Sequence, residues 1–187
     1  FEAGECLLCH EAHASDLGGM TTSSERELCS GCHSDIDEQL EAGKSRHAPV
    51  DQGECSQCHN PHQANLAKLL LMQSPDLCFG CHADIGERVQ DQEAHAPAAR
   101  DCLRCHTAHA AEEIGLLTKS LHPLCADCHE TDDPSFSTAH LGIEATAMDC
   151  GNCHNPHGSR DPKLFEDNVH APFALGSCEV CHIVEQE

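Results

Sequence analysis

Apolar residues in this chain of 187 amino acids come in short clusters separated by polar and proline-containing stretches. The longest apolar run, Leu69 to Met72, is far too short to span a bilayer. Leucine and alanine recur at helical spacing over residues 65–73 and 112–121, which predicts a modest helix in each segment. No stretch alternates β-branched and polar residues, so we expect essentially no β-sheet. The pattern predicts small helices joined by mostly irregular backbone.

Every cysteine belongs to one of eight copies of the pentapeptide Cys-x-x-Cys-His. This spacing is the attachment signal for c-type haem, in which both thiols add to the haem vinyl groups and the histidine binds iron. The cysteines predicted to carry haem are Cys6, Cys9, Cys29, Cys32, Cys55, Cys58, Cys78, Cys81, Cys102, Cys105, Cys125, Cys128, Cys150, Cys153, Cys178 and Cys181. The proximal iron ligands are predicted to be His10, His33, His59, His82, His106, His129, His154 and His182. The chain is therefore expected to hold eight covalently attached haem c groups.

Other uses of paired cysteines fit less well. A zinc ribbon closes one metal site with four ligands and does not require a histidine after every second cysteine. Cysteines three residues apart are poorly placed to join distant segments as disulfides. A thioredoxin-like redox pair needs one such motif at a helix start rather than eight.

Composition indicates what fills the interior. The chain has no Trp or Tyr and only five Phe, so the aromatic core of an ordinary domain is missing. Eight motifs leave about 23 residues for each haem, too few to build a protein core around it. We therefore expect a small-helix, mostly irregular multihaem cytochrome fold in which the stack of haems forms the core. Without haem, the chain is expected to be disordered.

The motifs form a repeat. Those that begin at residues 6, 55, 102 and 150, called first-type here, lie 49, 47 and 48 residues apart. Those at 29, 78 and 125, called second-type, each follow a first-type motif by 23 residues. This period predicts a single elongated domain made of four dihaem repeats at about residues 1–50, 51–98, 99–145 and 146–187.

The last motif departs from the period. It begins at Cys178, which is 28 residues after Cys150 rather than 23, and no second histidine follows it closely. Its lead-in, HAPFALGSC, has the spacing of HAPVDQGEC before the first-type motif at Cys55. Ligand assignment is therefore least secure in the last repeat.

Eight further histidines recur in register and supply one distal ligand for each iron. Four lie three residues after a first-type proximal histidine, namely His13, His62, His109 and His157. Four lie in the linkers, three of them in His-Ala-Pro, namely His47, His95, His140 and His170. His122 is out of register, and we expect a surface histidine there, with ligation across a contact between two copies as the alternative. Met20, Met72 and Met148 do not recur in register and are expected to be packing residues.

Spacing restricts which iron the second histidine of a first-type motif reaches. Two imidazoles one helical turn apart emerge from the same face, so they do not hold opposite faces of one iron. The second histidine must then bind a different haem. Each His-x-x-His pair is expected to tie two haems close together, and the sequence leaves open which haem each distal histidine reaches.

The net charge of the chain limits which partners it is expected to bind. The formal net charge of −22 argues against nucleic acid or anionic lipid as a ligand. It fits basic redox partners or bound cations, and equally a solvated acidic surface with no specific partner. The first residues lead at once into a haem motif, which we interpret as the start of a mature exported chain without a membrane anchor.

The repeating unit His-Ala-Pro, CHNPH and Leu-Cys-x-x-Cys-His resembles the doubled Cys-x-x-Cys-His multihaem cytochrome family over essentially the whole chain. Its relatives include periplasmic decahaem cytochromes that thread porins, pentahaem electron donors, and extracellular cytochromes that form filaments. The resemblance implies bis-histidine haems in stacked and T-shaped pairs that carry electrons across or beyond the cell envelope.

Two classes of function remain open. With histidine on both faces of each iron, the chain is expected to conduct electrons in the periplasm or outside the cell, to a redox partner or along copies of itself joined end to end. The alternative is a multihaem enzyme with one open haem site. Such enzymes need polypeptide to shape a pocket, which this chain hardly has, and we therefore favour electron transfer.

Overall fold

The computed structural model describes residues 4–91 and 94–181, apart from the side chains of Asp91 and Cys178. The chain divides into two compact units. Unit 1 combines Phe1–Cys81 with Asp101–Ser120, and unit 2 combines His82–Arg100 with Leu121–Glu187. Because this division does not follow the boundaries of the four dihaem repeats, the repeat-based domain stays a prediction.

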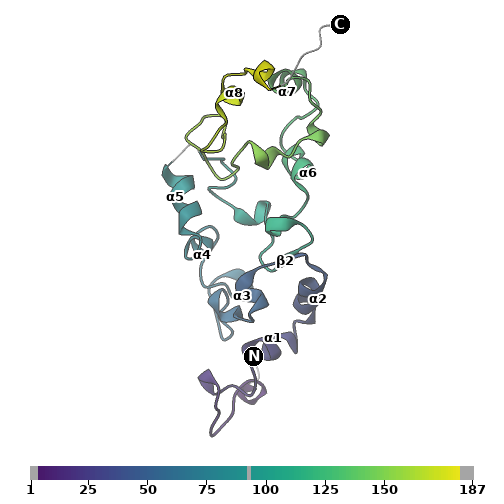
Figure 1. Cartoon of the computed structure of the whole chain (residues 1–187). Helices are drawn as coiled ribbons and strands as arrows, with labels where there is room; N and C mark the ends of the chain where they lie inside the picture. The colour runs from purple at the N-terminus through teal and green to yellow at the C-terminus, as the bar shows by residue number, and fades with distance from the viewer. Residues whose placement is uncertain (1–3, 92–93, 182–187) are drawn as a thin grey trace. The chain divides into compact units, whose positions relative to one another are not determined.

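Unit 1 contains a small two-stranded sheet and a helix that contacts it; Figure 1 labels this helix α2 and one of the strands β2. Its elements are α1 (Glu25–Ser30), α2 (Ser34–Ala42), β1 (Ser45–Arg46), α3 (Ala48–Asp51), α4 (Asp76–Phe79) and β2 (Ala110–Ala111). The two strands run antiparallel, with Ser45 opposite Ala111. Leu40 of α2 is 2% exposed and Ala110 of β2 is 7% exposed. Gly43 permits this approach, because a Cβ there would lie 2.8 Å from the Ala110 Cβ.

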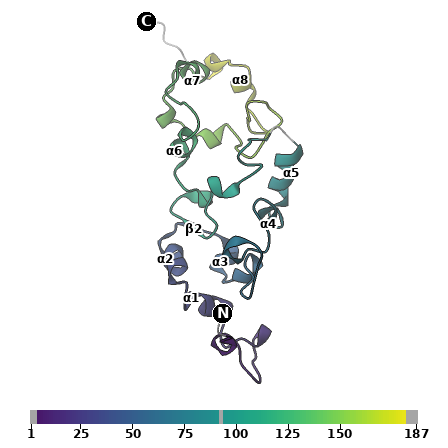
Figure 2. The same cartoon turned by 180° about the vertical axis from the view of Figure 1, so that it is seen from behind.

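Unit 2 contains α5 (Ala83–Asp91), α6 (Leu121–Ala126), α7 (Pro134–Ala139) and α8 (Ala171–Ala174), seen from behind in Figure 2. Arg88 of α5 donates to the carbonyl oxygen of Gly158 at 3.1 Å and to the carboxylate of Asp167 at 3.0 Å. These bonds attach α5 to the loop that follows the Cys150 motif.

Local sequence explains where several helices begin. Ser24 caps α1 by accepting from the Glu27 backbone N–H, and the Glu27 carboxylate accepts from the Ser24 backbone in return. Asp133 caps α7 in the same position, followed by Pro134 in the first turn.

The predicted fold class is confirmed: the described part of the chain contains short helices, irregular backbone and strands of only two residues. The predicted helices at 65–73 and 112–121 are wrong. The structure has only the 3-10 turns Ala67–Leu69 and Ile114–Leu116 there, each interrupted by left-handed backbone. The longest helices, α2 and α5, instead follow second-type motifs.

The polypeptide buries little of its own apolar surface. In the described residues only Leu40, Val89, Ala110 and Ala145 are buried apolar side chains. Ile114, at 86% exposed, and Leu141, at 75%, are examples of large apolar side chains that the chain itself does not cover. Among the described helices, none has the length and apolar character that crossing a bilayer requires. The fold is therefore a wrapper that places the Cys-x-x-Cys-His motifs.

Candidate functional site

The four regular first-type motifs adopt one local structure. Their cysteines open 3-10 turns at Cys6–Leu8, Cys55–Gln57, Cys102–Arg104 and Cys150–Asn152. In each turn the backbone N–H groups of the second cysteine and of the histidine donate to the carbonyl of the first cysteine. Cys178–Val180 forms the same kind of turn and follows α8, just as Cys55 follows α3. The last motif therefore has first-type surroundings, as its lead-in predicted.

A loop returns from each regular first-type motif to its own histidine. The histidine forms an isolated antiparallel bridge with the residue eleven positions on: His10 with Thr21, His59 with Leu70, His106 with Leu117 and His154 with Phe165. Its Nδ1–H donates to the backbone carbonyl nine residues on, in Gly19, Lys68, Gly115 or Lys163, at 2.7 to 2.8 Å. This bond fixes the tautomer, and it would leave the Nε2 lone pair to bind a metal ion.

The carbonyls that accept these bonds lie in unusual backbone. Gly115 has a φ of 72°, but Lys68 and Leu69 occupy the same left-handed region with φ of 57° and 55°. A side chain in that region costs roughly 1 kcal/mol or more per residue. Left-handed non-glycine residues cluster at functional sites. The return loop therefore accepts unfavourable backbone where it contacts the histidine.

Second-type motifs are built on α-helices. The first cysteine of each lies in α1, α4 or α6, and α2 begins directly after His33. In the described part of the chain, no hydrogen bond reaches the side chains of His33 and His129. The same pentapeptide thus holds its histidine in two different ways.

Unit 1 brings two pairs of histidine rings close together. The ring centroids of His10 and His62 lie 5.8 Å apart, with their planes 27° apart. Those of His59 and His109 lie 6.3 Å apart at 36°. Each pair joins a proximal histidine to the second histidine of the next first-type motif. Burial lowers the pKa of His109, and neighbouring His59 and His47 lower it further, which favours the neutral imidazole that binds metal.

Unit 2 brings two further pairs together, in which the second partner comes from a linker. His95 and His129 lie 6.0 Å apart at 23°, and His140 and His154 lie 6.3 Å apart at 64°. Burial, followed by the charge of His129, lowers the pKa of His95. All four pairs therefore match one predicted proximal ligand with one predicted distal ligand.

The separation of these pairs fits a single metal ion between two rings. A metal–imidazole bond of about 2 Å on each side, extended on each side by the distance from the nitrogen to its ring centre, gives centroids roughly 6 Å apart. Among the described residues, no cluster of three or more His, Cys, Asp or Glu side chains has the arrangement of a closed metal site.

Thiols of successive motifs meet within unit 1. Burial, followed by the Cys55 thiol that hydrogen-bonds to Cys29, raises the pKa of Cys29 to about 12. Burial likewise raises the pKa of Cys78 to about 11, with Cys102 as its hydrogen-bonded neighbour. The described cysteines form no disulfides. A second-type motif thus places its first thiol against that of the following first-type motif.

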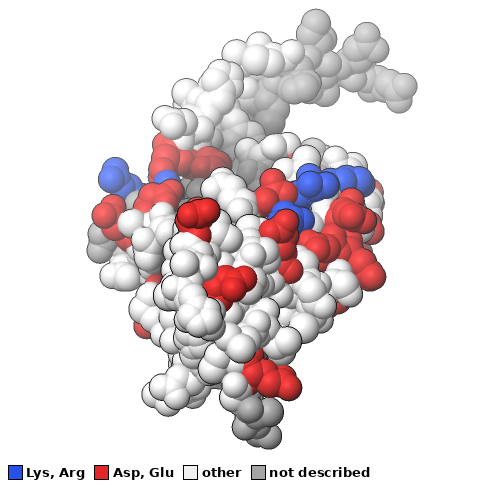
Figure 3. All heavy atoms as spheres, turned by 90° about the horizontal axis from the view of Figure 1, so that it is seen from below, with Lys and Arg blue, Asp and Glu red and all other residues white. Residues whose placement is uncertain are grey.

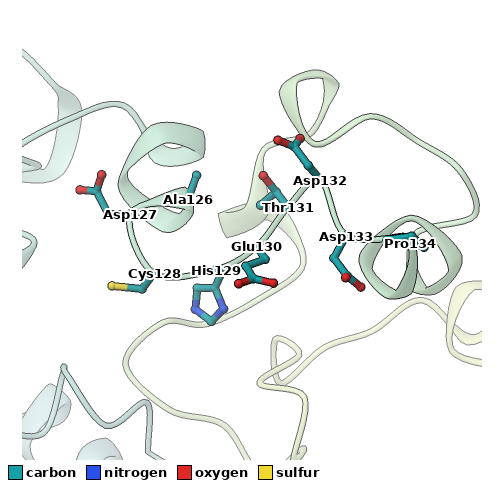
Figure 4. A pocket seen from close by; sticks show the side chains of 9 residues that line it. All are labelled: Ala126, Asp127, Cys128, His129, Glu130, Thr131, Asp132, Asp133 and Pro134. Carbon is teal, nitrogen blue, oxygen red and sulfur yellow. The ribbon is translucent and has the colours of Figure 1, made fainter.

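Space and charge around a second-type motif are shown in Figure 4. A cavity of about 600 Å³ is lined by residues 126–134, with the ring of His129 beside Glu130 on its wall. Asp132 and Asp133 continue the acidic lining. Figure 3 shows the same predominance of carboxylates on a wider surface. A bulky ligand at His129 would therefore lie in an acidic environment.

Comparison with known families now decides what these motifs are. Four stretches, residues 1–38, 47–87, 95–134 and 144–169, match the family described as the doubled CXXCH motif. Together they cover more than three quarters of the chain. The chain belongs to this family. It is a multihaem c-type cytochrome. Comparison with curated proteins gave no match.

The matches also agree with the irregular end of this cytochrome. Each of the first three contains one first-type and one second-type motif, whereas the fourth contains only the Cys150 motif and stops before Cys178. Proteins that carry haem c are exported, and this cytochrome is therefore an exported protein.

The residues of this cytochrome fit haem c. The thiols lie in pairs at the attachment spacing, the histidines face one another at the separation of two axial ligands, and apolar side chains such as Ile114 offer a surface for a macrocycle. Bound haem supplies reversible one-electron chemistry at its iron. The paired cysteines would hold the macrocycle by two thioethers, the Nδ1 hydrogen bonds orient the four first-type imidazoles, and exposed apolar side chains such as Ile114 would lie against the bound group.

Some predicted ligands are not brought together. Among the described residues, no ring contact joins His13, His33, His122 or His170 to a second histidine. His182 and the side chain of Cys178 lie outside the described residues.

Two residues that position second histidines were not predicted from the sequence. Asn60 and Asn155, the asparagines of CHNPH, accept from the backbone N–H groups of His62 and His157 at 3.0 and 3.1 Å. This Asx turn orients the second histidine. The Asn-Pro that recurs in the two CHNPH sequences could have predicted this turn. The carbonyls nine residues after each first-type histidine carried no signal, because any residue has a carbonyl.

Proposed function

We propose that this protein is an octahaem electron carrier in which histidines hold both faces of each iron and electrons pass from haem to haem along the chain. All eight motifs retain both cysteines and the histidine, which supports eight attachment sites. The observation that carries the proposal is the four histidine pairs at centroid separations of 5.8 to 6.3 Å.

Paired histidines support a carrier over an enzyme. An iron with an imidazole on each face has no open position for a substrate, whereas catalysis at haem needs one. At the His10 and His59 sites, both rings of the pair come from this chain. Bis-imidazole ligation without methionine also favours low reduction potentials, especially in an acidic surrounding.

Contacts between motifs support a continuous path in unit 1. The thiol of Cys29 interacts with those of Cys9 and Cys55, and Cys58 interacts with Cys81. Cys78 in turn hydrogen-bonds to Cys102. Because each thiol attaches to the edge of a macrocycle, neighbouring thiols bring macrocycle edges close together. Short edge-to-edge distances let electrons move without leaving the protein.

We place this transport in the periplasm or outside the cell, with basic redox proteins or further copies of the chain as partners. Haem c in an exported protein supports this location, and the net charge of −22 supports basic partners. Docking of copies end to end would make a cytochrome filament. Electron micrographs of the native protein test this part: filaments support end-to-end assembly, and separate particles contradict it.

A pair of matched variants tests the ligation. Intact-mass measurement of matured wild-type protein should give eight haem additions, and its ferric EPR spectrum should be wholly low-spin. His62→Ala should convert one haem to a high-spin form that binds carbon monoxide when reduced, because His10 keeps its iron while the opposite face opens. His122→Ala, the control, should leave the spectrum unchanged. A low-spin spectrum in His62→Ala, or fewer than eight additions, contradicts the proposal.

A further inference from the structure

One of the four histidine pairs differs from the others in ring orientation. The planes of His10 and His62, of His59 and His109, and of His95 and His129 lie 27°, 36° and 23° apart. The planes of His140 and His154 lie 64° apart at a similar centroid separation of 6.3 Å. Three sites thus hold imidazoles whose planes lie within 36° of each other, and one holds crossed imidazoles.

Phenylalanines lie against both rings of the crossed pair. The Phe136 ring stacks on His140 with centroids 4.0 Å apart and planes 25° apart. The Phe165 ring stacks on His154 at 5.0 Å and 14°. Phe173 contacts Phe165 edge-on at 5.8 Å and touches neither histidine in these contacts. Three of the five phenylalanines of the chain therefore gather at this one pair.

Backbone carbonyls fix both rings as well. The Nδ1–H of His140 donates to the Phe136 carbonyl at 2.9 Å, and that of His154 donates to the Lys163 carbonyl at 2.8 Å. Ser159, only 1% exposed, donates its hydroxyl to the Phe165 carbonyl and accepts from the Asp161 N–H at 3.1 Å. Each imidazole is thus held by a stacked ring and a hydrogen bond, which leaves little freedom to rotate.

Phe165 is the residue at which this repeat differs from the other three. It is the bridge partner of His154, and Thr21, Leu70 and Leu117 are the partners of the other first-type histidines. Flat, rigid phenylalanine at this position dictates the plane of the ring stacked on it. Leucine, as in two of the other repeats, does not.

We propose that Phe136 and Phe165 are positioning residues that hold crossed axial imidazoles at the haem attached to Cys150 and Cys153, and thereby give this haem an electronic structure unlike that of the three parallel sites. The proposal rests on the proposed bis-histidine ligation. Two parallel imidazoles interact with only one of the two iron d orbitals that can form π bonds with them, and so separate the energies of these two orbitals. Two crossed imidazoles interact with both orbitals and leave their energies nearly equal. A low-spin ferric iron whose two orbitals are nearly equal in energy gives an EPR signal dominated by one very large g value.

EPR spectroscopy of the full matured chain tests this. The EPR spectrum of the wild-type protein should contain a low-spin signal with a very large g value, called the large-g signal. The haem attached to Cys150 should contribute one haem equivalent of spin to this signal. Phe165→Leu, which places there the residue that two other repeats carry, should move that equivalent into the ordinary rhombic low-spin signal. Phe136→Leu should act in the same direction. Phe173→Leu, the control that removes a phenyl ring not stacked on histidine, should leave the spectrum unchanged.

A ligand variant assigns the signal even where a phenylalanine variant folds poorly. His140→Ala should remove one haem equivalent of large-g signal and replace it with one high-spin equivalent. Retention of the full large-g signal in His140→Ala, or in both phenylalanine variants, overturns the inference. A wholly low-spin wild type without a large-g signal overturns the inference and leaves the proposed function standing. High-spin iron in the wild type is the result that contradicts the proposed function.

Discussion

First-type and second-type motifs carry the same pentapeptide but support their histidines differently. At a first-type motif the chain returns after nine residues, so that the Nδ1–H of His59 donates to the Lys68 carbonyl at 2.7 Å. At the second-type motif of Cys29 the chain continues into α2, and within the described part no hydrogen bond reaches the ring of His33. The pentapeptide fixes the covalent chemistry, and the flanking residues fix how each imidazole is oriented.

This difference predicts two classes of haem in one chain. A carbonyl on Nδ1 raises the basicity of the imidazole and favours ferric iron. The return loop achieves this with left-handed backbone at Lys68 and Leu69, which costs conformational energy. We infer that the loop depends on the iron–histidine bond to stay in place, whereas a helix such as α2 has its own backbone hydrogen bonds.

Removal of one haem from each class should give the largest effect. The first-type variant Cys55→Ser with Cys58→Ser and the second-type variant Cys29→Ser with Cys32→Ser should each lose one haem by intact mass. Each should lose on the order of 2–5 kcal/mol of stability, as when a crosslink is removed from a small domain. The first-type variant should melt at the lower temperature, because its return loop also loses its anchor. Circular dichroism measures the two melting temperatures. Equal values would contradict a separate stabilising role for the return loop.

Substitutions that change backbone strain inside the return loop should change the stability by less than the loss of a haem does, and in a direction that can be predicted. Gly115 has a φ of 72° and open space where a Cβ would lie, so Gly115→Ala adds only backbone strain, of about 1 kcal/mol. Lys68→Gly should stabilise by up to about 1 kcal/mol, because glycine relieves strain at a φ of 57°. For a chain of this size, each kilocalorie corresponds to about 2–4 °C in melting temperature.

The control is Gly18→Ala. This position also has open space for a Cβ but is not among the glycines with positive φ. It should show no loss of stability. A melting temperature that falls equally in Gly18→Ala and Gly115→Ala would show that the left-handed backbone is not the cause.

The sequence predicted the parts of the site that depend on local chemistry. The Cys-x-x-Cys-His motifs, their period and the division into two types follow from spacing alone. The helices predicted at 65–73 and 112–121 failed because Leu69 and Leu116, read as a helical pattern, have left-handed backbone in the return loops. An apolar pattern reports which side chains are covered. It does not report whether a helix or a haem covers them.

The pairing of the histidines could not be predicted from the sequence, for a different reason. His62 faces His10 of the preceding repeat rather than its own neighbour His59. The spacing of three residues excludes His59 as the partner of His62, but the choice among the remaining histidines depends on how the repeats pack. The crossed rings of His140 and His154 likewise depend on Phe136 and Phe165, which become neighbours only in the fold.

The last effect in this comparison, similar in size to that of the backbone changes, belongs to the capping box of α1, the helix that carries the second-type Cys29. Ser24→Ala removes the hydroxyl that accepts from the Glu27 backbone N–H, and such a change costs about 1 kcal/mol in a typical helix. Ser34→Ala in the first turn of α2 is the matched control and should cost little, because the N-cap of α2 is His33 and no side chain caps that helix.

The cap adds a pH dependence that the control lacks. The side-chain hydrogen bond from Ser24, followed by the one from its backbone, lowers the pKa of Glu27 from 4.5. Because the folded pKa lies below the unfolded one, this contribution is complete above about pH 4.5 and is lost as the pH falls through the lowered folded value. The difference in melting temperature between wild type and Ser24→Ala should therefore narrow below pH 4.5. A gap that stays constant across this range would mean that the Glu27 carboxylate contributes nothing to the cap, and that the hydrogen bond from the Glu27 backbone N–H to the Ser24 hydroxyl acts alone.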